Sequence, residues 1–257
     1  MKSISLYVDN GSYLTKLHPF TKLLYILTAI VVTLLTKSFV VYVAFIGFSI
    51  MLLTSGRILK KTVPLIAFSF SILITIFLIH GLFHQGNVNV LFRIGPVSFY
   101  KEGLQYAASI GLNILNLLLS FAVFILTTKP TELVEEMEKR GFSARIGYMI
   151  CSVFQIIPQM TGTMKTIMDA QRSRGLETEG KLTTRMKAFL PLISPVVMSS
   201  LISTRERAIA LEVRCFDSKN QKTFLTVREK RKSNAIINVI LILLIVATIV
   251  WRIILCL

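Results

Sequence analysis

The sequence predicts an all-α, polytopic membrane protein with about five transmembrane helices and one long polar helical region. Of the 257 residues, 53% are apolar and only 16% are charged, whereas about a quarter of the residues of a soluble domain carry charge. The mean hydropathy is +0.68. The apolar residues also lie in long uncharged blocks, which favours membrane helices over the short alternating segments of a β protein.

Five uncharged runs are the expected transmembrane helices. They cover residues 23–36 (extended back through Phe20), 38–56, 62–83, 103–128 and 233–251. Each run is close to the roughly 20 residues that cross the hydrocarbon core of a bilayer. We therefore expect transmembrane helices 1–4 within residues 1–128, a polar region at 129–232, and a C-terminal transmembrane helix within 233–257.

The positive charges predict the orientation in the membrane. Arg57, Lys60 and Lys61 follow the second run, and residues 129–232 hold 19 Lys and Arg against 11 Asp and Glu. Loops rich in Lys and Arg stay in the cytoplasm, which predicts a cytoplasmic N-terminus, a cytoplasmic 129–232 region and an external loop at 84–100. The expected location is the cell membrane, and the lipid bilayer is an expected partner.

The formal net charge of +16 does not indicate nucleic-acid binding. Residues 129–232 carry a net charge of +8, and the other residues carry the remaining +8. No basic stripe is interleaved with aromatic residues, as a nucleic-acid surface would require. Much of the excess positive charge is the asymmetry that orients a membrane protein, and no nucleic-acid partner is expected.

The polar region predicts one short helix and two long ones. Pro130 near the first position and Glu132 in the first turn favour a helix start, and Arg140 and Gly141 favour its end. Helical patterns then cover 146–174 and about 184–214, each about 45 Å long if it is helical throughout. Both patterns begin apolar and become charged toward their C-terminal ends.

Both long patterns carry an apolar face that is rich in methionine. Its residues recur at intervals of three or four, with Met149, Val153, Ile157, Met160, Met164 and Met168 in the first pattern and Leu190, Ile193 and Val197 in the second. Seven of the nine methionines lie between 137 and 198. Two interpretations are open: ordinary core packing, or an adaptable surface that repacks against different partners.

Residues 175–182 imitate a phosphate-binding P-loop but lack its chemistry. Gly175, Gly180 and Lys181 have the right spacing, yet Leu182 occupies the place where Ser or Thr must hold Mg²⁺. Glu177 and Glu179 would also put negative charge into the phosphate cradle. We expect a polar turn between two helices, no ATP binding and no cofactor.

A membrane-embedded enzyme is a weaker alternative. His80 and His84 lie four residues apart and have no third ligand nearby, so a polar pair at the membrane interface is expected instead of a metal site. Cys151, Cys215 and Cys256 are scattered and have neither metal-ligand nor disulfide spacing. Groupings of Ser, His and Asp with catalytic spacing are absent from the sequence, and we predict no enzymatic activity and no metal site.

The two long patterns end alike. Ala170-Gln-Arg-Ser-Arg174-Gly175 and Ala210-Leu-Glu-Val-Arg214-Cys215 share the pattern Ala-x-x-x-Arg-small, 40 residues apart. A cation at a helix C-terminus is favoured by the helix dipole, and Gly175 suits the residue after the cap. From spacing alone, two ordinary helix ends and a pair of functional motifs remain equally open.

These motifs resemble the two Ala-Arg-Gly motifs of the transmembrane T component of energy-coupling factor (ECF) transporters, the family that includes the cobalt-transport permease. His18-Pro-Phe-Thr-Lys22 is similar to that family's Asp-Pro-Arg-Thr-Lys entry into the first span. Thr127-Thr-Lys-Pro130-Thr-Glu-Leu133 resembles its Thr-x-Pro-x-Asp-Leu segment, and Phe154-Gln-Ile-Ile-Pro158 resembles its Arg-Phe-Ile-Pro. The resemblance covers nearly the whole chain.

The resemblance implies a coupling function. T components carry cytoplasmic coupling helices whose arginine-bearing ends dock into two ABC-type ATPase subunits, identical or paired, and they contact a membrane-embedded S component that binds a vitamin or metal ion. The expected docking residues are Arg174 and Arg214 with Ala170, Arg172, Ser173, Gly175, Ala210, Glu212, Val213 and Cys215. The methionine-rich face of the two long patterns is the expected contact for the S component.

The chain departs from the family at a few positions. Ser173 and Val213 stand where the family usually has Ala, Cys215 stands where it has Gly, and Val153 replaces the arginine before Phe154. Because Cys in a left-handed conformation costs roughly 1 kcal/mol, we expect the second helix end to be shaped differently from the first.

The other alternative is the substrate-conducting subunit of an ordinary ABC transporter. Such a subunit would carry polar or charged residues inside its spans. The first four spans hold only small polar groups such as Asn113 and Asn116, which favours a coupling subunit over a conducting one.

Overall fold

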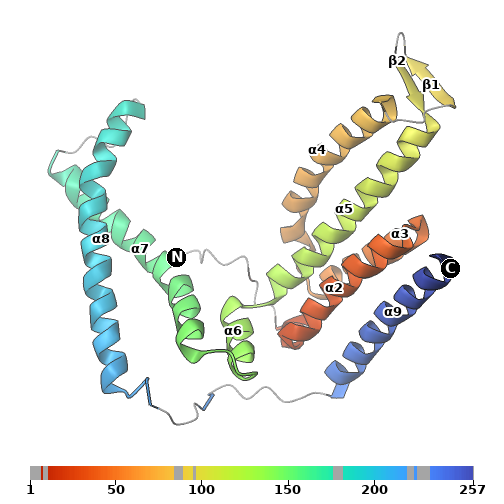
Figure 1. Cartoon of the computed structure of the whole chain (residues 1–257). Helices are drawn as coiled ribbons and strands as arrows, with labels where there is room; N and C mark the ends of the chain where they lie inside the picture. The colour runs from red at the N-terminus through yellow and green to blue at the C-terminus, as the bar shows by residue number, and fades with distance from the viewer. Residues whose placement is uncertain are drawn as a thin grey trace. The chain divides into compact units, whose positions relative to one another are not determined.

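The computed structural model describes residues 7, 11–83, 89–94, 97–175, 182–218, 223–224 and 232–256, with side chains for all of these except 92–94, 97–98, 182–190, 232 and 256. The elements are α1 (Tyr13–Lys16), α2 (Pro19–Thr36), α3 (Phe39–Ser55), α4 (Leu59–Phe83), β1 (Val90–Ile94), β2 (Val97–Tyr100), α5 (Lys101–Thr127), α6 (Pro130–Glu138), α7 (Ala144–Ser173), α8 (Leu182–Val213) and α9 (Lys232–Cys256) (Figure 1).

The chain divides into two compact units. One unit comprises Ser5–Glu136 and Lys230–Leu257, and we call it the membrane bundle. The other comprises Met1–Ile4 and Met137–Glu229, and we call it the helical hairpin unit. The short helix α6 runs from the first unit into the second.

The membrane bundle contains the predicted spans. Within the described residues, α2, α4, α5 and Ser233–Leu255 of α9 are long and apolar enough to cross a membrane, and α3 is a shorter apolar helix of 17 residues. These five helices coincide with the five uncharged runs of the sequence. The predicted polytopic, almost entirely α-helical membrane fold is confirmed.

Local chemistry sets the limits of these helices. Pro19 occupies the first turn of α2, and the side chain of His18 caps the helix by accepting a hydrogen bond from the amide of Phe20. The helix ends at Lys37, whose φ of 47° is left-handed and reverses the chain directly into α3. The left-handed turn at Lys37 explains why only two residues separate the first two spans.

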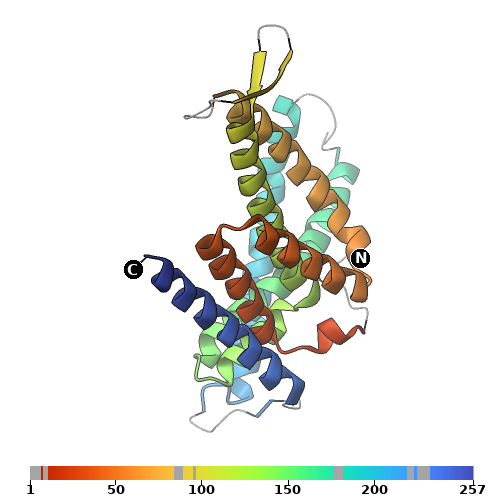
Figure 2. The same cartoon turned by 90° about the vertical axis from the view of Figure 1, so that its right-hand side faces the viewer.

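Helices α4 and α5 pack side by side near the β-hairpin and diverge away from it (Figures 1 and 2). At Gly111 of α5, an added Cβ would lie 2.9 Å from a methyl group of Leu73 on α4, so the two helices approach as closely as a glycine allows. On another face of α5, Leu119 and Val123 form an apolar core with Ile46 and Leu53 of α3.

The bundle also buries polar groups. The hydroxyls of Tyr25 on α2 and Ser49 on α3 are 2.7 Å apart and form a hydrogen bond. Asn116 of α5 is 0% exposed, and neither atom of its amide has a hydrogen-bond partner among the described residues. Burying an unpaired amide is costly, so Asn116 is an energetically unusual residue of the bundle.

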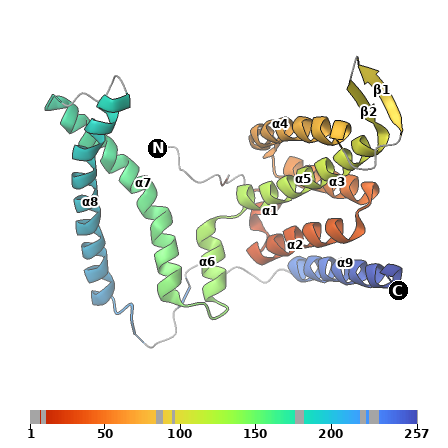
Figure 3. The same ribbon diagram turned by 45° about the horizontal axis from the view of Figure 1, so that its top comes forward.

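Helix α9 packs along α2 (Figure 3). The hydroxyl of Tyr13 lies 2.9 Å from that of Ser233 at the start of α9. None of the apolar window of α9 is buried by the protein. A helix that is apolar all round and packed against a single neighbour is suited to a lipid environment.

The segment between α4 and α5 contains a β-hairpin that the sequence did not predict. Strands β1 and β2 are antiparallel, with Val90 opposite Tyr100 and Ile94 opposite Val97. Each strand has only four or five residues, which is too short for an alternating pattern to be distinguished from a loop. His84, Gly95 and Pro96 lie outside the described residues.

The helical hairpin unit consists mainly of α7 and α8, which are antiparallel. They have 30 and 32 residues, so their lengths are about 45 and 48 Å at 1.5 Å per residue. Their limits lie within two residues of the predicted 146–174 and 184–214. Near the start of α7, the side chain of Glu138 packs against Gly147 and leaves no room for a Cβ there.

Candidate functional site

The first arginine-bearing end closes α7 as the sequence predicted. Ser173 is the last helical residue, Arg174 is the C-cap, and Gly175 has a φ of +88°. The amide of Gly175 donates to the carbonyl oxygen of Arg172 at 3.0 Å. A Cβ on Gly175 would meet nothing within 4 Å, so the glycine is required by its backbone conformation and not by crowding.

The second end also closes its helix, α8, with a left-handed residue after the arginine. Cys215 has a φ of +54°, and its amide donates to the carbonyl oxygen of Glu212 at 2.9 Å. The amide of Phe216 donates to the carbonyl oxygen of Leu211 at 3.0 Å, which completes a Schellman motif. The expectation of a different shape is therefore wrong for the backbone turn at this residue, because Cys215 adopts the left-handed conformation that Gly175 adopts at the first end.

Contacts beyond the cap explain why the second end keeps the left-handed turn. The rings of Phe216 and Tyr148 pack at a centroid distance of 5.3 Å, which places the end of α8 against the start of α7. The guanidinium of Arg145 binds both carboxylate oxygens of Asp217, with Nη2 at 2.6 and 2.7 Å. These contacts hold the residues after Arg214 in place and offset the cost of a left-handed cysteine.

The two arginines lie at opposite ends of the hairpin. Phe216, two residues after Arg214, packs against Tyr148 near the start of α7. Arg174 lies 26 residues after Tyr148 on α7, so the two arginine ends are roughly 40 Å apart at 1.5 Å per residue. Both residues are exposed. Within the described part of the chain, neither guanidinium has a hydrogen bond or an ion pair. The neighbouring residues Ala170, Arg172, Ser173, Ala210, Glu212 and Val213 are exposed as well.

Most of the methionine-rich face is exposed on the same hairpin. The side chains of Met149, Val153 and Ile157 on α7 are 57%, 54% and 41% exposed. Ile193 and Val197 on α8 are exposed to a similar degree. These residues do not form a core within the unit, which favours the interpretation of this face as a surface that packs against something else.

Three predicted members of the face are placed differently. Met160 lies in the seam between α7 and α8, and Met164 and Met168 are half-buried. The side chain of Leu190 lies outside the described residues. The exposed part of the face is thus carried by the first half of α7 and the middle of α8.

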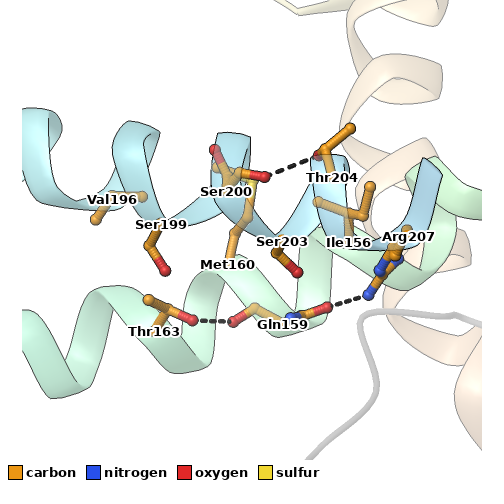
Figure 4. A pocket seen from close by; sticks show the side chains of 10 residues that line it. All are labelled: Ile156, Gln159, Met160, Thr163, Val196, Ser199, Ser200, Ser203, Thr204 and Arg207. Carbon is orange, nitrogen blue, oxygen red and sulfur yellow. Dashed lines mark hydrogen bonds between the residues drawn. The ribbon is translucent and has the colours of Figure 1, made fainter. Parts of the chain in front are cut away.

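The seam between α7 and α8 is polar, which the sequence pattern did not predict. Figure 4 shows Met160 and the small polar side chains of Thr163, Ser199, Ser200 and Ser203 around a shallow pocket. Gln159 accepts a hydrogen bond from Arg207 across the seam. Residues 48 positions apart form this bond, and periodicity along one helix gives no sign of such a pairing.

The other chemical candidates gain no support. Residues 176–181 of the P-loop-like stretch lie outside the described residues, but the stretch follows a helix and not the strand that a P-loop requires. Within the described residues, no cluster of His, Cys, Asp and Glu could hold a metal ion. The ring of His80 packs edge-on against Tyr106, with the ring centroids 5.1 Å apart.

Comparison with known proteins identifies the family. The family model of the cobalt transport protein CbiQ matches residues 10–225. The chain is 29% identical to the energy-coupling factor transporter transmembrane protein EcfT of Clostridium kluyveri over 247 residues, which are 90% of this chain and 89% of that protein. It is 28% identical to EcfT of Brevibacillus brevis, over 97% of this chain and 98% of that protein, and 28% identical to EcfT of Bacillus subtilis, over 86% of each. The chain therefore belongs to the CbiQ cobalt transport protein family, among the transmembrane T components of energy-coupling factor transporters.

Proposed function

We propose that this T component couples ATP hydrolysis by two ABC-type ATPase subunits to uptake of a vitamin or metal ion held by a separate S component. The observation that carries the proposal is the pair of exposed helix ends, each with an arginine before a left-handed residue, at opposite ends of one hairpin. Two similar ends, roughly 40 Å apart, suit two similar ATPase subunits.

The chemistry of arginine supports docking. A guanidinium presents a planar fork that binds a carboxylate through two charge-assisted hydrogen bonds, which a lysine ammonium does not reproduce. Arg174 and Arg214 are exposed and have no partner among the described residues. Their forks are available to carboxylates of the ATPases, and a left-handed residue ends each helix directly after its arginine.

The apolar face supports contact with the S component. Met149, Val153 and Ile157 are exposed on α7 with Ile193 and Val197 on α8. Methionine adapts its shape to different partners. The chain lies in the cell membrane in this proposal, with the N-terminus and residues 129–232 on the cytoplasmic side, where ATP is available.

The test is co-purification of the ATPases with single and double variants, Arg174→Ala and Arg214→Ala. Loss of one charged hydrogen-bonding pair costs about 2 kcal/mol, so each single variant should weaken ATPase binding roughly 30-fold, and the double variant should abolish transport. Arg174→Lys should bind the ATPases almost as weakly as Arg174→Ala, because lysine keeps the charge but lacks the planar fork that pairs with a carboxylate.

Arg205→Ala is the matched control, since Arg205 is an exposed arginine of α8 outside the two ends. It should bind the ATPases as the unaltered chain does. Membrane insertion should be normal in every variant. Full transport by the double variant would show that the two arginines do not carry docking.

A further inference from the structure

Side chains at the start of α2 contact both α5 and α6, on either side of the bend between those two helices. His18 and Lys22 are four residues apart and therefore lie on the same face of the helix. Lys22 bonds to the end of α5, and His18 bonds to α6. The membrane bundle thus holds its α5–α6 connection through one turn of one helix.

The contact of Lys22 is buried. Its side chain is only 4% exposed, and its ammonium donates to the carbonyl oxygen of Thr127 at 2.8 Å. Thr127 is the last residue of α5, where carbonyl groups lack helical partners. Lys22 supplies a donor and a positive charge at the negative end of the helix dipole.

The contact of His18 has a defined direction. Its Nδ1 accepts the hydrogen bond from the amide of Phe20, so its hydrogen is on Nε2. Nε2 lies 2.9 Å from a carboxylate oxygen of Glu136 and donates to it. Glu136 belongs to α6 and is almost fully buried.

The bend between the two contacts is set by the chain itself. Pro130 interrupts the helix of α5, because it has no amide hydrogen and disfavours the helical conformation for the residue before it. Thr128 is extended, with a φ of −118° and a ψ of 124°. A non-helical joint therefore separates α5 from α6, and side-chain contacts on its two sides contribute to the angle between these helices.

The far end of α6 is held as well. In the helical hairpin unit, the side chain of Glu138 packs against Gly147 of α7. The amide of Phe142 donates to the carbonyl oxygen of Met137 at 3.1 Å and closes the turn into α7. Helix α6 has nine residues, of which Glu136 contacts His18 in the membrane bundle and Glu138 contacts Gly147 in the helical hairpin unit.

We propose that His18, Lys22 and Glu136 form a brace that passes displacement of α6 into α2 and the membrane bundle. They are positioning residues for the coupling function proposed above, on which this inference rests. Without the brace, α6 rotates about the bend at Thr128, and displacement of the hairpin unit is not transmitted to the transmembrane helices.

The test uses the complete complex with its ATPase and S subunits, reconstituted into liposomes. His18→Asn keeps a good N-cap for α2 but is too short to reach Glu136, and Lys22→Met keeps the length of the side chain but removes the donor. Both variants should assemble and hydrolyse ATP, while uptake per ATP hydrolysed falls at least about fivefold, the lower end of coupling between sites. Lys22→Arg, which keeps a donor and the charge, should recover most of the uptake.

Lys16→Met is the matched control, because Lys16 is exposed at the end of α1. It should leave uptake per ATP unchanged. Unchanged uptake per ATP in both His18→Asn and Lys22→Met would overturn the brace, and so would failure of both variants to assemble, which would make the contacts purely structural. If the unaltered complex hydrolysed ATP without uptake, the proposed function itself would be wrong, which separates the two failures.

Discussion

Replacing Cys215 by glycine tests the conformation of the second arginine-bearing end. Cys215 has a φ of +54°, and a left-handed conformation costs an L-residue about 1–2 kcal/mol. Glycine removes this cost, but it also gives the unfolded chain more freedom, which offsets about 0.4–1 kcal/mol. Because both Schellman hydrogen bonds use backbone groups, they remain, and the net gain in the free energy of unfolding is about 0.5–1 kcal/mol.

Thermal unfolding of the purified protein in detergent, followed by intrinsic fluorescence, measures this gain. A gain of this size should raise the Tm by about 1–4 °C in a chain of this length. Gly175→Ala is the reciprocal variant, because Gly175 has a φ of +88° and open space around it. It should lower the Tm by a similar amount.

Cys215→Ala separates the backbone from the thiol, since it removes the sulfur but keeps the Cβ. Its Tm should stay close to that of the unaltered protein. An equal rise in Tm for Cys215→Ala and Cys215→Gly would refute the reasoning, because the gain would then come from loss of the exposed thiol. A fall in Tm for Cys215→Gly would refute it as well.

Two further substitutions test contacts within each unit. Asp217→Asn removes the charge that faces Arg145. Because both side chains are more than two-thirds exposed, the free energy of unfolding should fall by less than about 1 kcal/mol. The free energy of ATPase binding, measured by co-purification, should fall by more than the free energy of unfolding. Asn116→Leu replaces a buried amide without hydrogen-bond partners among the described residues by an apolar side chain of similar shape. It should leave the Tm unchanged or raise it, since replacing an unpaired polar group removes about 1–3 kcal/mol of desolvation cost, and a clear loss of Tm would mean that the amide binds a partner in the folded protein.

The spans were predictable because each depends on a local property of the chain. An uncharged run near the length of a membrane helix is read directly from the sequence, and α2, α3, α4, α5 and α9 coincide with such runs. The limits of α7 and α8 were predictable for a similar reason, since periodicity and residues such as Gly175 mark helix ends locally. The β-hairpin was missed because its strands are too short to carry a pattern.

The geometry of the candidate site was only partly predictable. The repeated Ala-x-x-x-Arg-small pattern located both arginine ends, but a general rule about cysteine gave the wrong shape for the second. The turn at Cys215 depends on Phe216 packing against Tyr148 and on Asp217 binding Arg145. Those partners are about 70 residues away in the chain, and one sequence carries no signal for such a pairing.

The sequence by itself determined the membrane class, the five spans, the two long helices and the arginine at the end of each. These properties depend on composition and on spacing within one helix, where hydrophobicity and backbone hydrogen bonding act over a few residues. Only the tertiary structure decided that the two arginine ends lie at opposite ends of one hairpin, that Met160 faces the seam, and that one turn of α2 holds both α5 and α6. Such arrangements depend on which distant side chains meet, and packing in three dimensions sets those meetings.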